Sequence, residues 1–209
     1  MGAHMTKAVV FDIGMVLVEW QPEAFYDRLI GPDRRRAFWA ETGIAAMNER
    51  IDLGAPFAET VRAHADLHPA WRAEVMAWHD HWLDMCTPAI PHSVRLLSAL
   101  RAKGVPVFAL SNFGIGTFEL ACRHYPFLTN FDRLFVSGYL GLIKPDPRFY
   151  AALEAGTGYS GADLLFADDR PENIEAAAAR GWKTHLFTTP AGWADRLVAE
   201  GFLTEGEAA

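Results

Sequence analysis

The sequence has only two cysteines, Cys86 and Cys122, among its 209 residues. Two thiols in a chain of this length exclude the disulfide framework of a small secreted protein and fit a reducing compartment. We therefore expect a cytoplasmic protein in which both thiols are reduced and buried.

Long apolar runs and an excess of positive charge are also missing. No apolar run is long enough to cross a bilayer, and no apolar segment of the signal-peptide kind is visible. The chain has 19 Lys and Arg residues against 26 Asp and Glu residues, a formal net charge of −7. These features argue against nucleic-acid and membrane partners, so an anionic substrate must be bound by a local cationic pocket. We expect residues 1–5 to be the remnant of an expression tag.

The sequence is rich in apolar residues, which make up 51% of the chain, whereas charged residues make up 22%. Short apolar segments alternate with helical ones over the second half of the chain, which predicts an α/β fold with a doubly wound, parallel, five-stranded sheet. The predicted strands are Ala8–Phe11, Pro106–Leu110, Arg133–Ser137, Leu164–Ala167 and Lys183–Phe187. The helices expected between and after them cover residues 93–103, 114–124, 146–155, 172–180 and 191–200.

A long stretch after the first strand has the helical pattern without a strand. We expect residues 18–90 to form an all-helical cap over the strand ends, and residues 6–17 and 91–209 to form the α/β core. The predicted cap helices are residues 22–30, 33–42, 44–50, 56–67 and 69–85. Trp71, Trp78 and Trp82 fall on one face of the last of these and predict a packed stripe. His64 and His68, four residues apart, could bind a metal, but we favour a solvated helix face.

Polar side chains follow the predicted strands where each strand ends. Asp12 follows the first strand, Ser111 and Asn112 follow the second, and Asp168 and Asp169 follow the fourth. Each of these alone is explained by turn or capping chemistry. Because parallel strands end at one edge of the sheet, we expect all of them to converge there, where ligands bind in open α/β sheets.

Phosphoryl transfer explains this convergence. The carboxylate of Asp12 can attack phosphorus and form an acyl phosphate, which divides one difficult step into two. Hard oxygen ligands, with Asp12 and Asp169 among them, suit Mg²⁺. Ser111 and Asn112 can hydrogen-bond phosphate oxygens, and Lys144, in the loop after the third strand, can supply positive charge.

Four motifs of the chain resemble those of the haloacid dehalogenase superfamily of hydrolases. They are FDIGMVL, LSNFG, GLIKPDP and FADDRPENI, in that order. The chain most resembles the sugar-phosphate phosphatases similar to bacterial α-D-glucose-1-phosphatase. The resemblance implies a Rossmann-like core with a helical cap, Mg²⁺ as cofactor, and a small phosphate ester, with a sugar phosphate favoured, as substrate.

The resemblance also implies a role for each residue of the motifs. Asp12 is the nucleophile that carries the aspartyl phosphate and a metal ligand, and Lys144 neutralises charge. Asp169 binds the metal directly, and Asp168 acts on it through water. The role of Ser111 and Asn112 is to hold phosphate, and that of Asn173 is to brace the acidic loop.

Gly14 departs from the pattern of most phosphatases of this superfamily, which have a second Asp at this position. The backbone carbonyl of Gly14 can still bind the metal, but the proton donor, usually worth about 10²–10⁴ in rate, is missing. An acidic anomeric leaving group, a bound water or Glu19 could compensate. Met15 is a second departure and makes the pocket floor less polar.

Two other functions are compatible with the sequence. A 2-haloacid dehalogenase, in which Asp12 attacks carbon without a metal, fits Gly14 but not the adjacent Asp168 and Asp169, whose charges would repel each other. A non-catalytic phosphometabolite-binding or partner-binding protein is the second. In the cap, Trp20 could bind substrate or pack the hinge, and Arg50 and Asp52 could bind hydroxyls or form a surface pair. Monomer and homodimer are both compatible with the sequence.

Overall fold

The computed structural model describes residues 6–209, so the predicted tag remnant lies outside the described residues. Within them, five strands form one parallel sheet of order β3-β2-β1-β4-β5. The strands are β1 (Ala8–Phe11), β2 (Val107–Ser111), β3 (Arg133–Val136), β4 (Leu164–Asp168) and β5 (Lys183–Leu186). The predicted fold class is confirmed, and each strand boundary lies within one residue of its predicted position.

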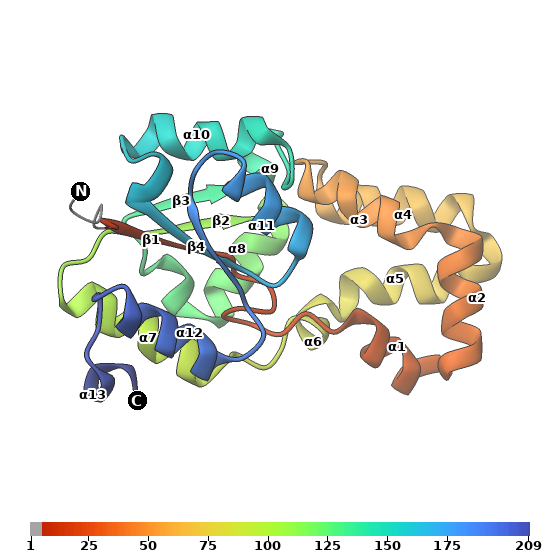
Figure 1. Cartoon of the computed structure of the whole chain (residues 1–209). Helices are drawn as coiled ribbons and strands as arrows, with labels where there is room; N and C mark the ends of the chain where they lie inside the picture. Colours follow the sequence, from red (N-terminus) through yellow and green to blue (C-terminus); the bar gives the residue numbers. More distant parts are fainter. Residues whose placement is uncertain (1–5) are drawn as a thin grey trace.

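Helices cover both faces of the sheet (Figure 1). Alternate residues of a strand face opposite sides, so Val9 and Phe11 belong to one apolar cluster and Ala8 and Val10 to the other. The first cluster includes side chains of α7 (Pro91–Ala102), α8 (Ile115–His124) and α12 (Pro190–Ala199). The second includes side chains of α10 (Pro147–Thr157) and α11 (Pro171–Ala178). Because β1 is central and buried on both sides, the residue that follows it is held rigidly.

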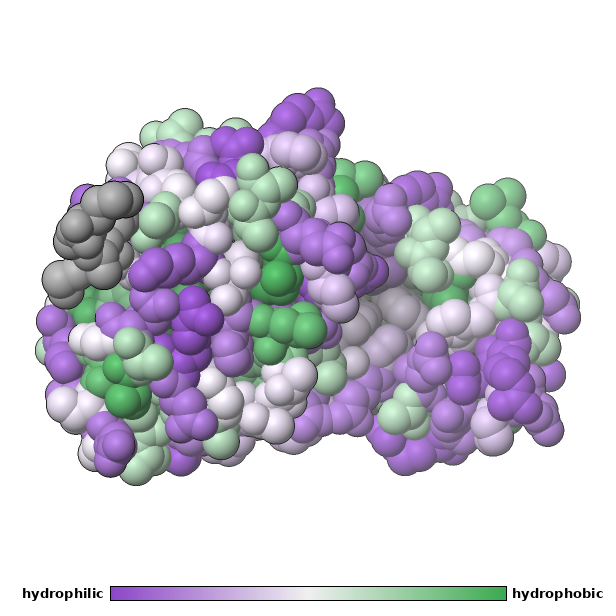
Figure 2. Space-filling view, viewed as in Figure 1, coloured by the Kyte–Doolittle hydropathy of each residue, from purple (hydrophilic) through white to green (hydrophobic). Residues whose placement is uncertain are grey.

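The helices that lie between β1 and α7 form a second lobe, and Figure 2 shows the two lobes joined across a narrower waist. They are α1 (Pro22–Ile30), α2 (Pro32–Thr42), α3 (Ile44–Asp52), α4 (Phe57–Leu67), α5 (Arg72–Asp80) and α6 (Trp82–Met85). Two linkers run side by side at the waist, where the Ile90 amide donates to the Leu17 carbonyl at 2.8 Å and the Glu19 amide to the Pro88 carbonyl at 2.9 Å. Among the described residues, no helix has both the length and the apolarity to span a membrane.

The predicted helix over residues 69–85 is wrong as a single element. It is a 3₁₀ turn (Pro69–Trp71) followed by α5 and α6, with a break at His81, whose φ is −119°. The two tryptophans on either side of the break share Trp20 as a neighbour but otherwise face different rings. The ring of Trp78 lies 6.0 Å from that of Tyr26 inside the cap, whereas the ring of Trp82 lies 5.5 Å from that of Phe113 in the core. The predicted burial of all three tryptophans of this segment is nevertheless observed.

The prediction of a solvated face for His64 is also wrong. His64 is only 7% exposed, and its ring centroid lies 4.6 Å from that of His68. The reason is that α4 packs along α5, so the face that carries His64 is covered.

A four-residue helix that the sequence did not suggest, α9 (Ser137–Leu140), joins the cap to the core. The Ser137 hydroxyl donates to the backbone carbonyl of Asp52 in the cap at 2.5 Å and accepts from the Phe113 amide in the core at 2.8 Å. Next to it, Gly54 packs directly on the backbone of Gly138. The end of α3 is therefore fixed to the core by a hydrogen bond and by close backbone packing.

This close packing predicts a large stability difference between two glycine substitutions. A Cβ on Gly54 would lie 2.6 Å from the Gly138 carbonyl oxygen, whereas a Cβ on Gly104 would meet nothing within 4 Å, and both residues have positive φ. We expect Gly104→Ala to cost about 1 kcal/mol for its backbone strain alone, and Gly54→Ala to cost about 2–4 kcal/mol because the backbone must also separate. Urea denaturation of both variants measures the difference, and equal costs would contradict this account of the junction.

Candidate active site

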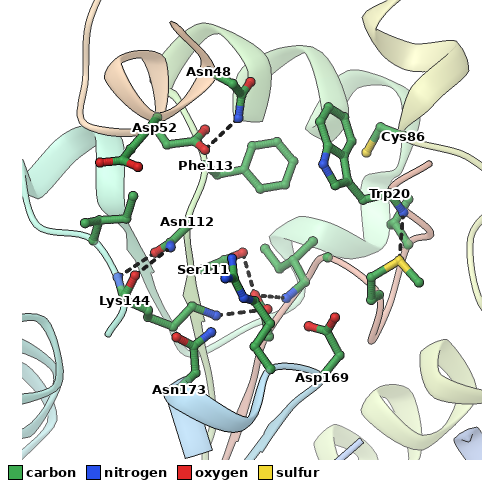
Figure 3. Close-up of a pocket in the computed structure, with 18 of the residues that line it drawn as sticks. Trp20, Asn48, Asp52, Cys86, Ser111, Asn112, Phe113, Lys144, Asp169 and Asn173 are labelled. Carbon is green, nitrogen blue, oxygen red and sulfur yellow. Dashed lines mark hydrogen bonds and ion pairs between the residues drawn. The ribbon is translucent and has the colours of Figure 1, made fainter. Parts of the chain in front are cut away.

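The predicted polar side chains meet at one edge of the sheet (Figure 3). Asp12 follows β1, and Ser111 and Asp168 are the last residues of β2 and β4. Lys144 reaches the same point from the loop between α9 and α10. The register explains the meeting, because Phe11 pairs with both Ala109 of β2 and Ala167 of β4, so the three strands end within two residues of one another.

Three carboxylates form the centre of this site. Asp12, Asp168 and Asp169 each place one carboxylate oxygen within 4.8 Å of those of the other two. Ligands about 2.1 Å from a common Mg²⁺ lie at most about 4.2 Å apart, so only small movements separate this arrangement from a metal site. Carboxylate oxygens are also the donors that Mg²⁺ prefers. The residues present therefore fit a divalent cation.

Lys144 lies between two of the carboxylates. Its Nζ is 2.9 Å from Asp12 Oδ2 and 2.6 Å from Asp168 Oδ2, and its side chain is 1% exposed. Burial lowers the pKa of Lys144, but attraction to the two carboxylates outweighs it, so the pKa lies above its usual value. Lys144 is therefore a fixed positive charge at the centre of the site.

Asp12 is held by donors on both of its oxygens. Oδ1 accepts from the Ile13 amide at 2.6 Å and from the Ser111 hydroxyl at 2.7 Å, while Oδ2 faces Lys144. Burial raises the pKa of Asp12 to about 7, although the charge of Lys144 acts in the opposite direction. An additional cation beside Asp12 would favour its ionised, nucleophilic form.

Asp168 and Asp169 have different surroundings. Asn173 Nδ2 lies 2.9 and 3.1 Å from the two oxygens of Asp168, and the Arg170 amide donates to Oδ1 at 2.9 Å. Asp168 is thus occupied by protein donors, whereas the half-buried Asp169 lines the cavity. Burial, with the charge of Asp168, raises the pKa of Asp169. This arrangement suits the predicted direct metal contact of Asp169 and the indirect contact of Asp168, which stay predictions.

The side chain of Asn112 contacts the backbone of Lys144. Its Nδ2 donates to the Lys144 carbonyl at 3.0 Å, and its Oδ1 accepts from the Lys144 amide at 2.7 Å. The sequence predicted a phosphate contact for this residue, which stays a prediction. The structure shows a positioning contact that the sequence did not suggest, because a loop-to-loop clamp leaves no periodic signal.

The two departures on the loop after β1 have clear structural consequences. A Cβ on Gly14 would meet no heavy atom within 4 Å, so the structure has room for the Cβ of an Asp at this position. Met15 has a φ of 56°, a left-handed conformation that glycine and asparagine adopt more readily than methionine does. Its sulfur lies 3.2 Å from the Trp20 amide nitrogen, which places an apolar thioether on the pocket floor as predicted.

A cavity of about 340 Å³ opens between this edge of the sheet and the cap. Trp20 lines it, and its ring also lies 5.9 Å from that of Trp78 and 5.6 Å from that of Trp82, so Trp20 packs the hinge and faces the cavity at once. Glu19, a predicted substitute proton donor, is not among the described residues that line the cavity.

Asp52 at the end of α3 lies on the cap side of the cavity, whereas its predicted partner Arg50 is exposed and does not line it. Asn48 Nδ2, one turn earlier, donates to Asp52 Oδ2 at 2.8 Å. Burial raises the pKa of Asp52 to about 7, against a hydrogen bond from the Gly114 amide that lowers it, and the charge of Glu49 raises it further.

This raised pKa predicts a pH-dependent effect of Asp52→Asn on stability. The pKa of Asp52 is about 3.9 in the unfolded chain and about 7 in the folded protein. Between these two pH values the folded protein holds a proton on Asp52 that the unfolded chain has lost, so the stability of the fold decreases as pH rises. The variant lacks this titration. The free energy of unfolding of Asp52→Asn minus that of the wild type should therefore rise by up to about 4 kcal/mol from pH 4 to pH 8. Urea denaturation at both pH values measures this, and an unchanged difference would argue against a raised pKa of Asp52 in the folded protein.

Comparisons with known proteins identify several similar chains. The sesquiterpene phosphatase astK of Aspergillus oryzae is 37% identical over 87 residues, which cover 41% of this chain and 44% of that protein. The chain spans less than half the length of the curated relatives it matches first.

Solved structures share the fold over nearly the whole chain. A HAD family enzyme of Bacteroides thetaiotaomicron, BT-2542, in complex with magnesium and inorganic phosphate, has a TM-score of 0.67 at 16% identity and covers 88% of this chain and 94% of its own. The L-2-haloacid dehalogenase of Xanthobacter autotrophicus has a TM-score of 0.62 at 19% identity and covers 95% of this chain and 85% of its own.

The family of the chain is shown by a sequence-family model that matches most of its length. The sequence model of the haloacid dehalogenase-like hydrolases matches residues 6–181, which include all four motifs and every residue of the candidate site described above. The chain therefore belongs to the haloacid dehalogenase-like hydrolase family.

Proposed function

We propose that this protein is a Mg²⁺-dependent phosphatase that hydrolyses a small phosphate monoester through an aspartyl phosphate on Asp12. The observation that supports it most strongly is the group formed by Asp12, Asp168 and Asp169, with the buried Lys144 paired to the first two. Three carboxylates against one ammonium leave excess negative charge in a buried site, which a divalent cation would balance. Asp12, Asp169 and the Gly14 carbonyl would hold the ion, with Asp168 acting through water.

When bound, Mg²⁺ supplies positive charge that offsets the repulsion between a carboxylate and a phosphate dianion. Asp12 attacks phosphorus, its oxygen forms the new P–O bond, and the bond to the alcohol oxygen breaks. Because Gly14 carries no acid, solvent provides the proton that the departing alkoxide takes up. A water molecule then attacks phosphorus and loses a proton to solvent, the P–O bond to Asp12 breaks, and the Asp12 carboxylate is released together with inorganic phosphate. Lys144 favours the ionised form of Asp12 before the attack and offers a donor to a phosphoryl oxygen.

The relatives support this reaction. One similar chain is named a sesquiterpene phosphatase, and one structure with the same fold binds magnesium and phosphate together. The resemblance to sugar-phosphate phosphatases makes a sugar phosphate one candidate substrate, with Trp20 in the wall that would contact it.

A dehalogenase is the second candidate, because an L-2-haloacid dehalogenase shares the fold. Its substrates carry a carboxylate. Of the described residues that line the cavity, Lys144 and Arg170 are the cationic ones, and both lie on the core side, while Glu49 and Asp52 form the cap side. A dehalogenase needs no metal, whereas three carboxylates around one lysine leave excess negative charge that a divalent cation would balance, so this geometry favours the phosphatase.

The direct test is a phosphate-release screen over sugar phosphates, nucleotides and small organic phosphates, with and without Mg²⁺. We expect release from at least one class that requires Mg²⁺ and is absent in Asp12→Asn. Release of halide from 2-chloropropionate without metal would favour the dehalogenase. Activity that Asp12→Asn leaves unchanged would favour the non-catalytic function.

The open space at Gly14 allows a gain-of-function prediction. In Gly14→Asp the new carboxyl group can extend into the cavity without a clash at its Cβ. We expect kcat to rise by about 10-fold or more on alkyl phosphates, whose leaving groups need a proton, and to change little on p-nitrophenyl phosphate, whose leaving group does not. An equal change in kcat on both esters would contradict the prediction, because it would show that the new carboxyl group does not act as a proton donor.

A further inference from the structure

The cavity has two chemically different ends. The carboxylates and Lys144 form one end, and the cap residues Asn48 and Asp52 form the other, with Phe113 drawn between them (Figure 3). Resting on the proposed phosphatase function, we propose that the alcohol part of the substrate is an apolar body that ends in a hydrogen-bond donor, a hydroxyl or an ammonium group, which Asp52 accepts.

Asp52 is held in place for such a contact. Asn48 donates to its side chain at 2.8 Å, the Gly114 amide donates to it as well, and Ser137 fixes its backbone carbonyl at 2.5 Å. An ionised carboxylate accepts about four hydrogen bonds, so acceptor capacity remains after Asn48 and Gly114. A preorganised acceptor loses little entropy when the ligand binds.

The walls between the two ends are mostly apolar. Aromatic rings, aliphatic side chains and sulfur-containing side chains together form them. These wall residues are Ile13, Met15, Val18, Trp20, Trp82, Cys86, Phe113 and Ile143. Burial raises the pKa of Cys86 to about 12, so its thiol is neutral and adds to the apolar surface. A sugar would place hydroxyl groups against these walls without partners, whereas an alkyl or aromatic body would not.

The charge of the cap end selects against anions. Asp52 and the nearby Glu49 are both acidic, and the cationic residues that line the described cavity, Lys144 and Arg170, come from the core. A second phosphate or a carboxylate at the distal end of the substrate would meet like charge. A hydroxyl or an ammonium would instead satisfy Asp52.

The test compares matched phosphate monoesters that differ only at the distal end, in butyl, hexyl and octyl series: alkyl, ω-hydroxyalkyl, ω-aminoalkyl and ω-carboxyalkyl phosphate. At the best chain length, we expect the hydroxyl or amino ester to exceed the alkyl ester in kcat/KM by about 10-fold to 100-fold. The carboxyl ester should fall about 10-fold or more below the hydroxyl ester. The larger of the hydroxyl and amino values identifies the donor.

Asp52→Ala is the diagnostic variant because it removes both acceptor oxygens, and Glu49→Ala removes a neighbouring acidic side chain at an exposed position as its matched control. Asp52→Ala should bring the hydroxyl-to-alkyl ratio to within about 3-fold of one. Its turnover of the alkyl ester should persist, which shows that the variant is folded. Glu49→Ala should retain most of the wild-type ratio.

Three results would overturn the inference: a wild type that does not distinguish the distal groups, an Asp52→Ala variant that keeps the preference, or glucose 1-phosphate as a better substrate than every ω-hydroxyalkyl ester. An equal loss of preference in Glu49→Ala would also overturn it, because the preference would then depend on the general negative charge of the cap end. If no ester is hydrolysed with Mg²⁺, the phosphatase proposal itself fails, and this outcome is distinct from the others.

Discussion

Asp12→Asn is expected to lower kcat for phosphate release by about 10⁴-fold or more, because the variant cannot form the covalent intermediate. The fold should survive the change. The Asn Oδ1 atom can still accept from the Ile13 amide and the Ser111 hydroxyl, and Lys144 keeps Asp168 as a partner. A buried carboxyl group whose pKa is raised to about 7 is also costly to keep ionised, and an amide avoids that cost.

The measurement pairs steady-state kinetics with a thermal melt. Asp84→Asn, on the surface of α6, is a matched control that should change neither the activity nor the melting temperature, because the Asp84 carboxylate is exposed and pairs with the exposed His81. A melting temperature within about 3 °C of the wild type together with lost activity would support the nucleophile. Retained activity on a phosphate ester would contradict it.

Lys144→Met is expected to have the largest effect on stability. The variant leaves the carboxylates of Asp12 and Asp168 buried with no positive charge between them. Removing one partner of a buried ion pair costs about 3–5 kcal/mol, because the remaining charge is uncompensated. Activity should fall by about 10³-fold or more, since the same ammonium is lost from the phosphate site.

The pH dependence identifies the cause of this destabilisation. At low pH the carboxylates take up protons, so the cost of Lys144→Met should shrink between about pH 7 and pH 4. Lys183→Met is the control, because the Lys183–Glu200 pair is partly exposed and worth about 0–1 kcal/mol. A cost for Lys144→Met that is equally small, or that grows on acidification, would contradict the central role of this lysine.

The sequence predicted the core of the site because its signal is local. An apolar run that ends at Asp12, and another that ends at Asp168, can each be recognised within ten residues. The parallel arrangement then dictates that these ends meet, and the structure brings Lys144 to both of them. Strand limits and fold class could be predicted from the same patterns.

The cap side of the site could not be predicted to the same depth. Arg50 and Asp52 are two residues apart in one helix, and only the packing of α3 on the core decides that Asp52 lines the cavity and that Arg50 does not. That packing depends on Ser137 in α9, a helix too short to give a periodic pattern. The break at His81 could not be predicted from the sequence either, because the helical spacing of the tryptophans continues across it.

The most direct test of the account is the position of the metal. We predict that a crystal grown with Mn²⁺ in place of Mg²⁺ has an anomalous difference peak about 2.2 Å from a carboxylate oxygen of Asp12 and from one of Asp169. The side chain of Lys144 should stay beside Asp12 in that crystal. An enzyme that hydrolyses phosphate esters with Mn²⁺ yet binds the ion elsewhere, away from these two carboxylates, would contradict the account.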